Sequence, residues 1–168
     1  YQFRNGSLTF VHVPSSDQEA VRTLIRCRHG FKEDSKKVKV RIFALLKTLG
    51  FHYPRSKWTK SHMAWLDSLT LPALSQQAFF EHRTCLEYLN IRIAAMDKTI
   101  SELAGSAPYA EAVKALVSLR GLSTLSAMTL ISEIVDFRRF PTAKALMAYL
   151  GLTPSEYSSS AVKKYGGI

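Results

Sequence analysis

The residues with the clearest potential for covalent chemistry are three consecutive serines at positions 158–160, near the end of the chain. A serine hydroxyl becomes a nucleophile only when a base or a local charge activates it, and the neighbouring sequence supplies no obvious base. The surrounding segment, residues 151–168, is rich in serine, glycine and lysine and includes Lys163 and Lys164. Taken by themselves, the serines could equally belong to a flexible polar loop.

A second candidate is the stretch of residues 116–127, where one predicted helix ends, Gly121 turns the chain and another helix begins. The first N–H groups of a helix have no partner within it, and the helix dipole adds positive charge there, so phosphate can bind. Gly121 would let a DNA backbone approach, while Ser123 and Thr124 add hydroxyl donors and Arg120 adds charge. The pattern indicates a helix-hairpin-helix motif that positions DNA without reading its sequence. The alternative is a plain helical hairpin, because Ser123 replaces the second outer glycine of the usual motif.

Arg138 and Arg139 follow the second helix of this hairpin. They could reach DNA phosphates, or they could simply complement the dipole at a helix C-terminus. Glu133 and Asp136 lie within one helical turn of each other, but without a third ligand they are better explained as charge balance for the arginines than as a metal site.

The composition favours a folded protein with a polyanionic partner. The chain has 168 residues, 46% of them hydrophobic, and a formal net charge of +10, which suits nucleic acid but also fits a merely basic soluble protein. Cys27 and Cys85 match no metal or redox spacing, so we expect free thiols and a cytoplasmic, nucleoid-associated protein. No apolar run reaches membrane-spanning length. Because the chain starts at Tyr1 and stops after two glycines at Ile168, we expect a piece of a longer protein.

Residues 8–13 predict a short strand or an extended lead-in, and a long helix should follow it. A capping box at residues 16–19 predicts a helix start there, and Gly50 predicts its end near Leu49. Arg28 and Ser35 interrupt its apolar seam. The other seam positions have three-four spacing: Val21, Leu24, Phe31, Val38, Ile42, Leu45 and Leu49.

A connector at residues 51–60 and a short helix at 60–69 should precede a second long helix, from about Pro72 to Ala104. This helix has a heptad seam in which only His82 is polar, and the seam should pack on another helix. The partner is either the first long helix or a helix of a neighbouring subunit. We expect a homodimer or tetramer that forms through the long helices. The seam residues are Phe79, His82, Leu86, Leu89, Ile93, Met96, Ile100 and Leu103.

Residues 105–108 break the helical pattern, and three shorter helices should follow at about 109–119, 124–135 and 142–150, the last capped by Thr142. The predicted fold class is therefore all-α: two long coiled-coil-like helices, then a small helical domain with a helix-hairpin-helix motif. The expected division is a lead-in at 1–15, an arm at 16–105 and a truncated domain at 106–168.

Three segments together resemble one family closely: residues 120–122 (Arg-Gly-Leu), 133–140 (Glu-Ile-Val-Asp-Phe-Arg-Arg-Phe) and 148–159 (Ala-Tyr-Leu-Gly-Leu-Thr-Pro-Ser-Glu-Tyr-Ser-Ser). They resemble insertion-sequence transposases with an N-terminal DEDD, RuvC-like domain and a C-terminal serine-bearing domain. That group includes Piv-type invertases and bridge-RNA-guided recombinases. The resemblance is most specific between residues 116 and 157.

The resemblance implies roles for the serine loop. Tyr157 matches the family tyrosine and Ser159 the nucleophile, while Ser160 stands where the family has glycine, so Ser158 and Ser160 are alternatives in register. Residues 163–164 match the basic stretch that follows. Magnesium is expected through a DEDD domain outside this chain, with none bound by the chain itself.

The resemblance also implies DNA as partner, guide RNA for some members, and strand cleavage through a covalent phosphoserine–DNA intermediate. We expect the fragment alone to be inactive. The main alternative is a non-catalytic DNA-binding or architectural helix-hairpin-helix protein, and a third is a structural coiled-coil protein whose basic charge is incidental. A steep fall of affinity with salt would separate phosphate contacts from a coiled-coil partner.

Overall fold

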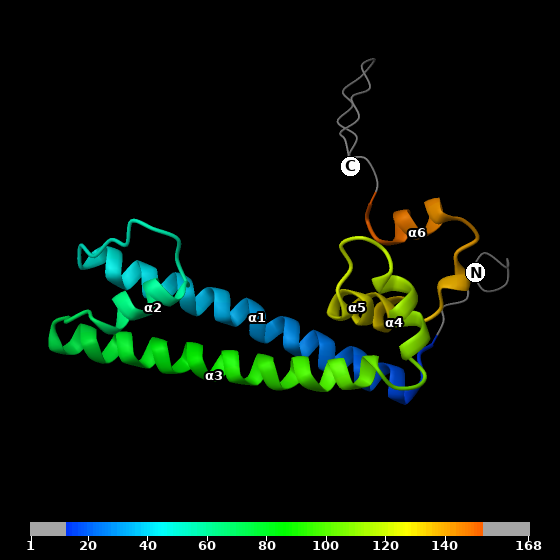
Figure 1. Ribbon diagram of the computed structural model, residues 1–168, viewed down its shortest axis with the longest axis horizontal. Helices are drawn as coiled ribbons and strands as arrows, with labels where there is room; N and C mark the ends of the chain where they lie inside the picture. The colour runs from blue at the N-terminus through cyan, green and yellow to red at the C-terminus, as the bar shows by residue number, and fades with distance from the viewer. Residues whose placement is uncertain (1–12, 153–168) are drawn as a thin grey trace, which may run out of the picture. The chain divides into compact units, whose positions relative to one another are not determined.

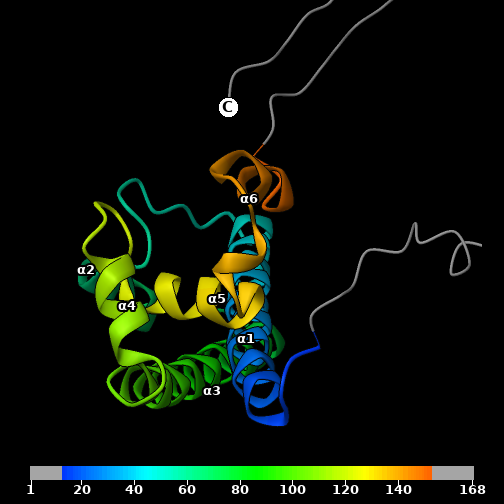
Figure 2. The ribbon, with the colours of Figure 1, turned by 90° about the vertical axis from the view of Figure 1, so that its right-hand side faces the viewer.

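The computed structural model describes residues 13–152, and this part of the chain is all-α, without strands, as predicted. Two long antiparallel helices, α1 (Ser16–Thr48) and α3 (Ala73–Ala104), pack against each other (Figure 1), and Figure 2 shows them from the end where α1 begins. The remaining elements are α2 (Lys60–Asp67), α4 (Ala110–Val117), α5 (Thr124–Ile134), the 3-10 helix η1 (Phe137–Arg139) and α6 (Ala143–Tyr149). The predicted strand falls almost wholly outside the described residues, and η1 was not predicted.

The chain divides into two compact units, one of residues 1–132 and one of residues 133–168. The first contains the pair of long helices, α2, α4 and most of α5, and the second contains η1 and α6. The division at 105/106 that the sequence suggests stays a prediction. No helix in the described residues is both long enough and apolar enough to cross a membrane.

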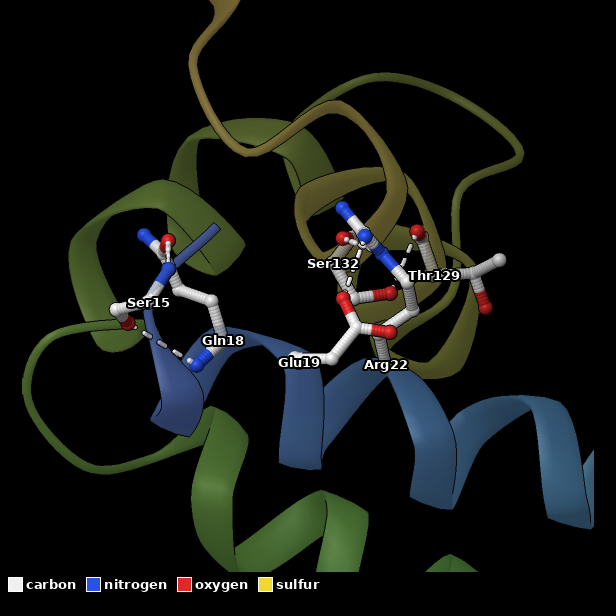
Figure 3. Close-up of polar contacts among 6 residues, drawn as sticks. All are labelled: Ser15, Gln18, Glu19, Arg22, Thr129 and Ser132. Atoms are coloured by element: carbon white, nitrogen blue, oxygen red, sulfur yellow. Dashed lines mark hydrogen bonds and ion pairs between the residues drawn. The ribbon is translucent and has the colours of Figure 1, made fainter. Parts of the chain in front are cut away.

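The start of α1 differs by one residue from the prediction. Ser15, not Ser16, is the N-cap: the Gln18 N–H donates to Ser15 Oγ at 3.3 Å, and the Ser15 N–H donates to Gln18 Oε1 at 2.9 Å (Figure 3). Glutamine completes a capping box as well as glutamate does, so either serine could serve. Glu19 is thereby left to pair with Arg22, at 2.7 Å. The end of α1 is as predicted, with Gly50 at φ +79° beyond the C-cap.

The seam of α3 packs on α1 of the same chain, which answers the question that the sequence left open. The predicted α3 seam is confirmed at most positions, although His82, Met96 and Leu103 are half-buried. On α1, Ile25 and Leu46 are buried more deeply than the predicted Leu24 and Leu45. The buried apolar residues of the two helices include Ile25, Val38, Ile42 and Leu46 on α1 and Phe79, Leu86, Leu89, Ile93 and Ile100 on α3. A homo-oligomer stays a prediction.

The two polar interruptions of the α1 seam meet polar partners on α3. Arg28 Nε donates to Asp97 Oδ1 at 2.5 Å, and its Nη2 donates to Oδ2 at 3.4 Å. Ser35, which is buried, donates from Oγ to Asn90 Oδ1 at 3.4 Å. Since a guanidinium removed from water needs a compensating partner, a shifted register that separated Arg28 from Asp97 would be penalised. These contacts therefore favour one alignment of the two long helices.

The start of α1 also holds α5. Arg22 Nε donates to the carbonyl oxygen of Ser132 at 2.9 Å, and the Ser132 hydroxyl donates to the carbonyl oxygen of Thr129 at 3.0 Å (Figure 3). Ala127 and Met128 of α5 are fully buried. The helix that follows the predicted DNA-binding hairpin is therefore tied to α1 by a charge-assisted hydrogen bond.

Candidate nucleic-acid interface

The predicted hairpin is the turn between α4 and α5, at residues 118–123. Gly121 adopts φ +94°, a left-handed conformation that glycine takes without the steric cost of a Cβ. A Cβ built on Gly121 would meet no atom within 4 Å. The glycine therefore serves the shape of the turn, and its outer side is open to an approaching backbone.

Ser123 does more for the protein than the sequence suggested, because it caps α5. Its carbonyl oxygen accepts the Ala127 N–H at 2.9 Å, and its hydroxyl accepts the Ser126 N–H at 3.2 Å. The same hydroxyl lies 3.0 Å from that of Ser126. Part of its hydrogen-bonding capacity is thus committed to the helix start, and its role toward DNA stays a prediction.

The two other predicted contacts are Arg120, within the turn, and Thr124, directly after it. Arg120 is exposed and forms no ion pair among residues 13–152, and Thr124 is the half-buried first residue of α5. Arg120, Gly121, Ser123 and Thr124 thus lie close together along the chain where the turn leads into α5, whose first N–H groups carry the positive end of the helix dipole. This arrangement suits a phosphate group.

Arg138 and Arg139 belong to the other unit, residues 133–168. The Arg138 N–H donates to Asp136 Oδ1 at 2.9 Å, so Asp136 caps η1. The Arg139 guanidinium lies 4.8 Å from the ring centre of Phe140 and 4.6 Å from that of Tyr149. Both arginines are exposed, and Arg139 is held by cation–π contact rather than by a carboxylate.

Ser158, Ser159, Ser160, Lys163 and Lys164 lie outside the described residues. Within residues 13–152, no three His, Cys, Asp or Glu side chains come together in a way that could hold a metal ion.

Sequence reasoning missed a cluster of rings at the end of the α1–α3 pair where α2 lies. It predicted only a connector at residues 51–60 and a short helix at 60–69. In the fold, the rings of Phe43, Tyr53, Trp58, His62 and Trp65 pack together, with His62 fully buried. The available signal was the density of aromatic residues among lysines between positions 43 and 65.

Comparisons with known proteins bear on the whole chain. Residues 113–168, which include the hairpin and the serine loop, match the family model described as "Transposase IS116/IS110/IS902 family". The chain is 34% identical over 167 residues to the "Putative transposase y4qE" of Sinorhizobium fredii, covering 98% of this chain and 40% of that protein. It is also 34% identical over 128 residues to the "Transposase for insertion sequence element IS1533" of Leptospira borgpetersenii, covering 74% of this chain and 37% of that protein.

The chain thus spans about two fifths of the length of these relatives. No solved structure matches it significantly. The match to the family model and the relatives agree with the resemblance carried by the hairpin and by residues 133–140. The chain belongs to the IS116/IS110/IS902 family of transposases and aligns with a part of its longer relatives.

Proposed function

We propose that this chain is the middle to C-terminal part of a transposase that cuts and rejoins DNA through a serine nucleophile, Ser159. The observation that carries the proposal is the family match over residues 113–168, which joins the open hairpin to the serine loop in one segment. Ser158 and Ser160 remain alternatives in register, because a serine stands at 160 where the related proteins are expected to have glycine.

In the proposed reaction, Ser159 Oγ attacks a DNA phosphorus atom and forms a phosphoserine ester. The bond from phosphorus to one bridging oxygen breaks, and the released sugar oxygen takes up a proton, matching the proton that serine loses. Attack by a DNA hydroxyl on the phosphoserine reverses these steps and joins a new strand. The number of phosphodiester bonds is conserved, so the reaction needs no external energy source.

The described part of the chain would hold the DNA. Arg120 and the first N–H groups of α5 would contact phosphate at the open side of Gly121, and the exposed Arg138 and Arg139 would add contacts from the second unit. Such contacts are independent of base sequence. Selection of the target would then rest on other parts of the transposase or on a guide RNA.

Magnesium would be supplied by a DEDD domain outside this chain. The described residues do not fit a metal site, since no three potential ligands gather within them. In this proposal, the chain itself contributes the placement of DNA and the serine hydroxyl.

The test is a search for a covalent protein–DNA adduct. The full-length transposase is incubated with magnesium, DNA carrying its element ends and any co-purifying RNA, then denatured and separated on a gel. An adduct that maps to Ser159 by peptide mass and vanishes in Ser159→Ala supports the proposal, with Ser158→Ala and Ser160→Ala as matched controls. If binding to DNA is intact and salt-sensitive but no adduct forms, the architectural alternative replaces it.

A further inference from the structure

A pocket of about 260 Å³ opens beside the ring cluster, at the end of the arm where α2 lies. Its walls come from the last turns of α1, from the segment after Gly50 and from α2. This volume lies just under the range of roughly 300–1,000 Å³ typical for drug-sized ligands, so the pocket suits a single small ring system. The lining residues that bear on binding are Phe43, Lys47, His52, Tyr53, Lys57 and Trp65.

The rings of Phe43, Tyr53 and Trp65, which line the pocket, belong to one cluster of ring contacts that also includes Trp58 and His62. Tyr53 lies 5.1 Å from Trp65 between ring centres, and Phe43 lies 5.2 Å from Trp58. Phe43, Tyr53 and Trp65 are only half-buried, so parts of their faces reach solvent at the pocket. Aromatic faces that are partly exposed in a concave site can stack on a planar ligand.

The backbone here is held in an unusual shape. Trp58 has φ +63°, which bulky residues rarely adopt because the Cβ approaches the following carbonyl oxygen. Its N–H donates to Nδ1 of the buried His62 at 3.1 Å, so the proton of the neutral imidazole lies on Nε2. Packing and this hydrogen bond together fix Trp58, and strain retained in this way is typical of binding sites rather than of plain connectors.

Lysines surround the rings. Lys39 Nζ lies 4.9 Å from the centre of the Trp58 ring, and Lys57 Nζ lies 4.3 Å from that of Phe43. Neither of these lysines nor Lys47 forms an ion pair in the part of the chain that the structure describes. Burial, and then the charge of Lys32, lower the pKa of Lys39. Lysines that contact aromatic rings and have no carboxylate partner can bind an anion without first breaking an ion pair.

We propose that this pocket binds an unpaired nucleotide of a single-stranded nucleic acid, with the base against Tyr53 and Trp65 and the neighbouring phosphates on Lys47 and Lys57. Aromatic faces beside cations are the combination that single strands require, since every base has a π-face and every link a negative charge. A paired base is stacked within its duplex and cannot enter. The proposal concerns an unpaired strand at the arm's end, so it does not depend on the serine chemistry or on the hairpin.

The chain carries its own reporter for this test. It has two tryptophans, Trp58 and Trp65, and both belong to the ring cluster. The 168-residue chain is titrated with single-stranded dT10, with rU10, with an abasic oligonucleotide of equal charge and with a duplex, and tryptophan emission is followed. Stacking of a base should quench the emission with dT10 or rU10 and leave it nearly unchanged with the abasic strand or the duplex. Tighter binding of rU10 would indicate RNA as the natural ligand, and tighter binding of dT10 a displaced DNA strand.

Variants separate the pocket from general attraction to a basic protein. Lys47→Gln with Lys57→Gln should weaken dT10 binding and lower the slope of log affinity against log salt by about 0.7 for each phosphate that a lysine no longer neutralises. Lys98→Gln is the matched control, since Lys98 is exposed on α3 and lined up with Glu102 at 4.0 Å. Tyr53→Leu should weaken binding by about fivefold or more, with circular dichroism confirming the fold of each variant.

Three results would overturn the proposal. One is binding of dT10 and rU10 without quenching, and another is equal quenching by the abasic strand. The third is a fall in affinity in Lys98→Gln as large as that in the pocket variants. None of these results touches the adduct test for Ser159, so failure here is distinguishable from failure of the proposed function.

Discussion

The contact between Arg28 and Asp97 allows a quantitative test of how the arm is specified. It joins α1 to α3 at a position where the apolar seam of α1 is interrupted, and it is nearly bidentate, with donor–acceptor distances of 2.5 and 3.4 Å. The perturbation is a double-mutant cycle with Arg28→Ala, Asp97→Ala and the combined variant. Alanine keeps helix propensity high at both positions, so the cycle isolates the interaction between the side chains.

The burial of the two side chains sets the expected magnitude. Their exposed fractions are 21% for Arg28 and 34% for Asp97, between those of a surface pair and a core pair. Exposed pairs contribute roughly 0.2–1 kcal/mol, whereas removing one partner of a fully buried pair costs about 3–5 kcal/mol. With partial screening by solvent, we expect a coupling free energy of about 1–2 kcal/mol.

The assay is urea unfolding followed by circular dichroism, with the free energy of unfolding obtained from each variant at a common slope. Lys98 and Glu102 provide the control cycle, because they are 4.0 Å apart with side chains 81% and 64% exposed. Their coupling should stay below about 0.5 kcal/mol. If the Arg28–Asp97 coupling is no larger than that of the control pair, the idea that polar partners fix the alignment of the arm is wrong.

Three further predictions concern the core, the ring cluster and the hairpin. Ile42→Ala, at a position with 0% exposure, should lower the free energy of unfolding by about 2–5 kcal/mol in the same urea assay, and a decrease under about 1 kcal/mol would contradict the packing. Burial, followed by nearby cations, lowers the pKa of His62 below 6.5, so the unfolded chain takes up this proton first as the pH falls. The stability contributed by neutral His62 is therefore present above about pH 6.5 and lost below it. Between about pH 7 and 5.5, the free energy of unfolding should fall less in His62→Phe than in the parent chain, and equal decreases would refute this. Gly121→Ala, which forces φ +94° on an L-residue at a cost of about 1–2 kcal/mol, should weaken duplex DNA binding severalfold, with Gly30→Ala as a neutral control. Unchanged duplex affinity in Gly121→Ala would remove the hairpin from the proposed interface.

Much of the fold follows from the periodicity of the sequence. The seam from Phe79 to Ile100 repeats over several turns, so its helix and its buried face could be predicted from spacing alone. The cap of α1 was misplaced by one residue because Ser15 and Ser16 are chemically equivalent, and only the backbone geometry selects between them. The polar partners of Arg28 and Ser35 could not be predicted, since they depend on the alignment of two helices separated by the connector and α2.

The candidate sites were predictable to different degrees. The hairpin was found because glycine between two helices has a local signature, whereas the commitment of the Ser123 hydroxyl to Ser126 appears only in three dimensions. The ring cluster was missed because residues 51–60 have no period, and Phe43, Tyr53 and Trp65 meet only after the chain reverses. Periodic patterns predict elements well, but they carry little information on how irregular segments pack.

The two long helices would also act as a spacer between the two proposed binding sites. At about 1.5 Å per residue, the 32 residues of α3 extend roughly 48 Å. The ring-lined pocket belongs to the end of the arm where α3 begins, and α4 follows the end where α3 finishes. One axial rise of B-form DNA is about 3.4 Å, so a ligand held at both ends would cover on the order of ten or more nucleotide steps. Lengthening or shortening both helices by matched turns would change that span while leaving each contact intact, so the arm would set the distance between the two proposed binding sites.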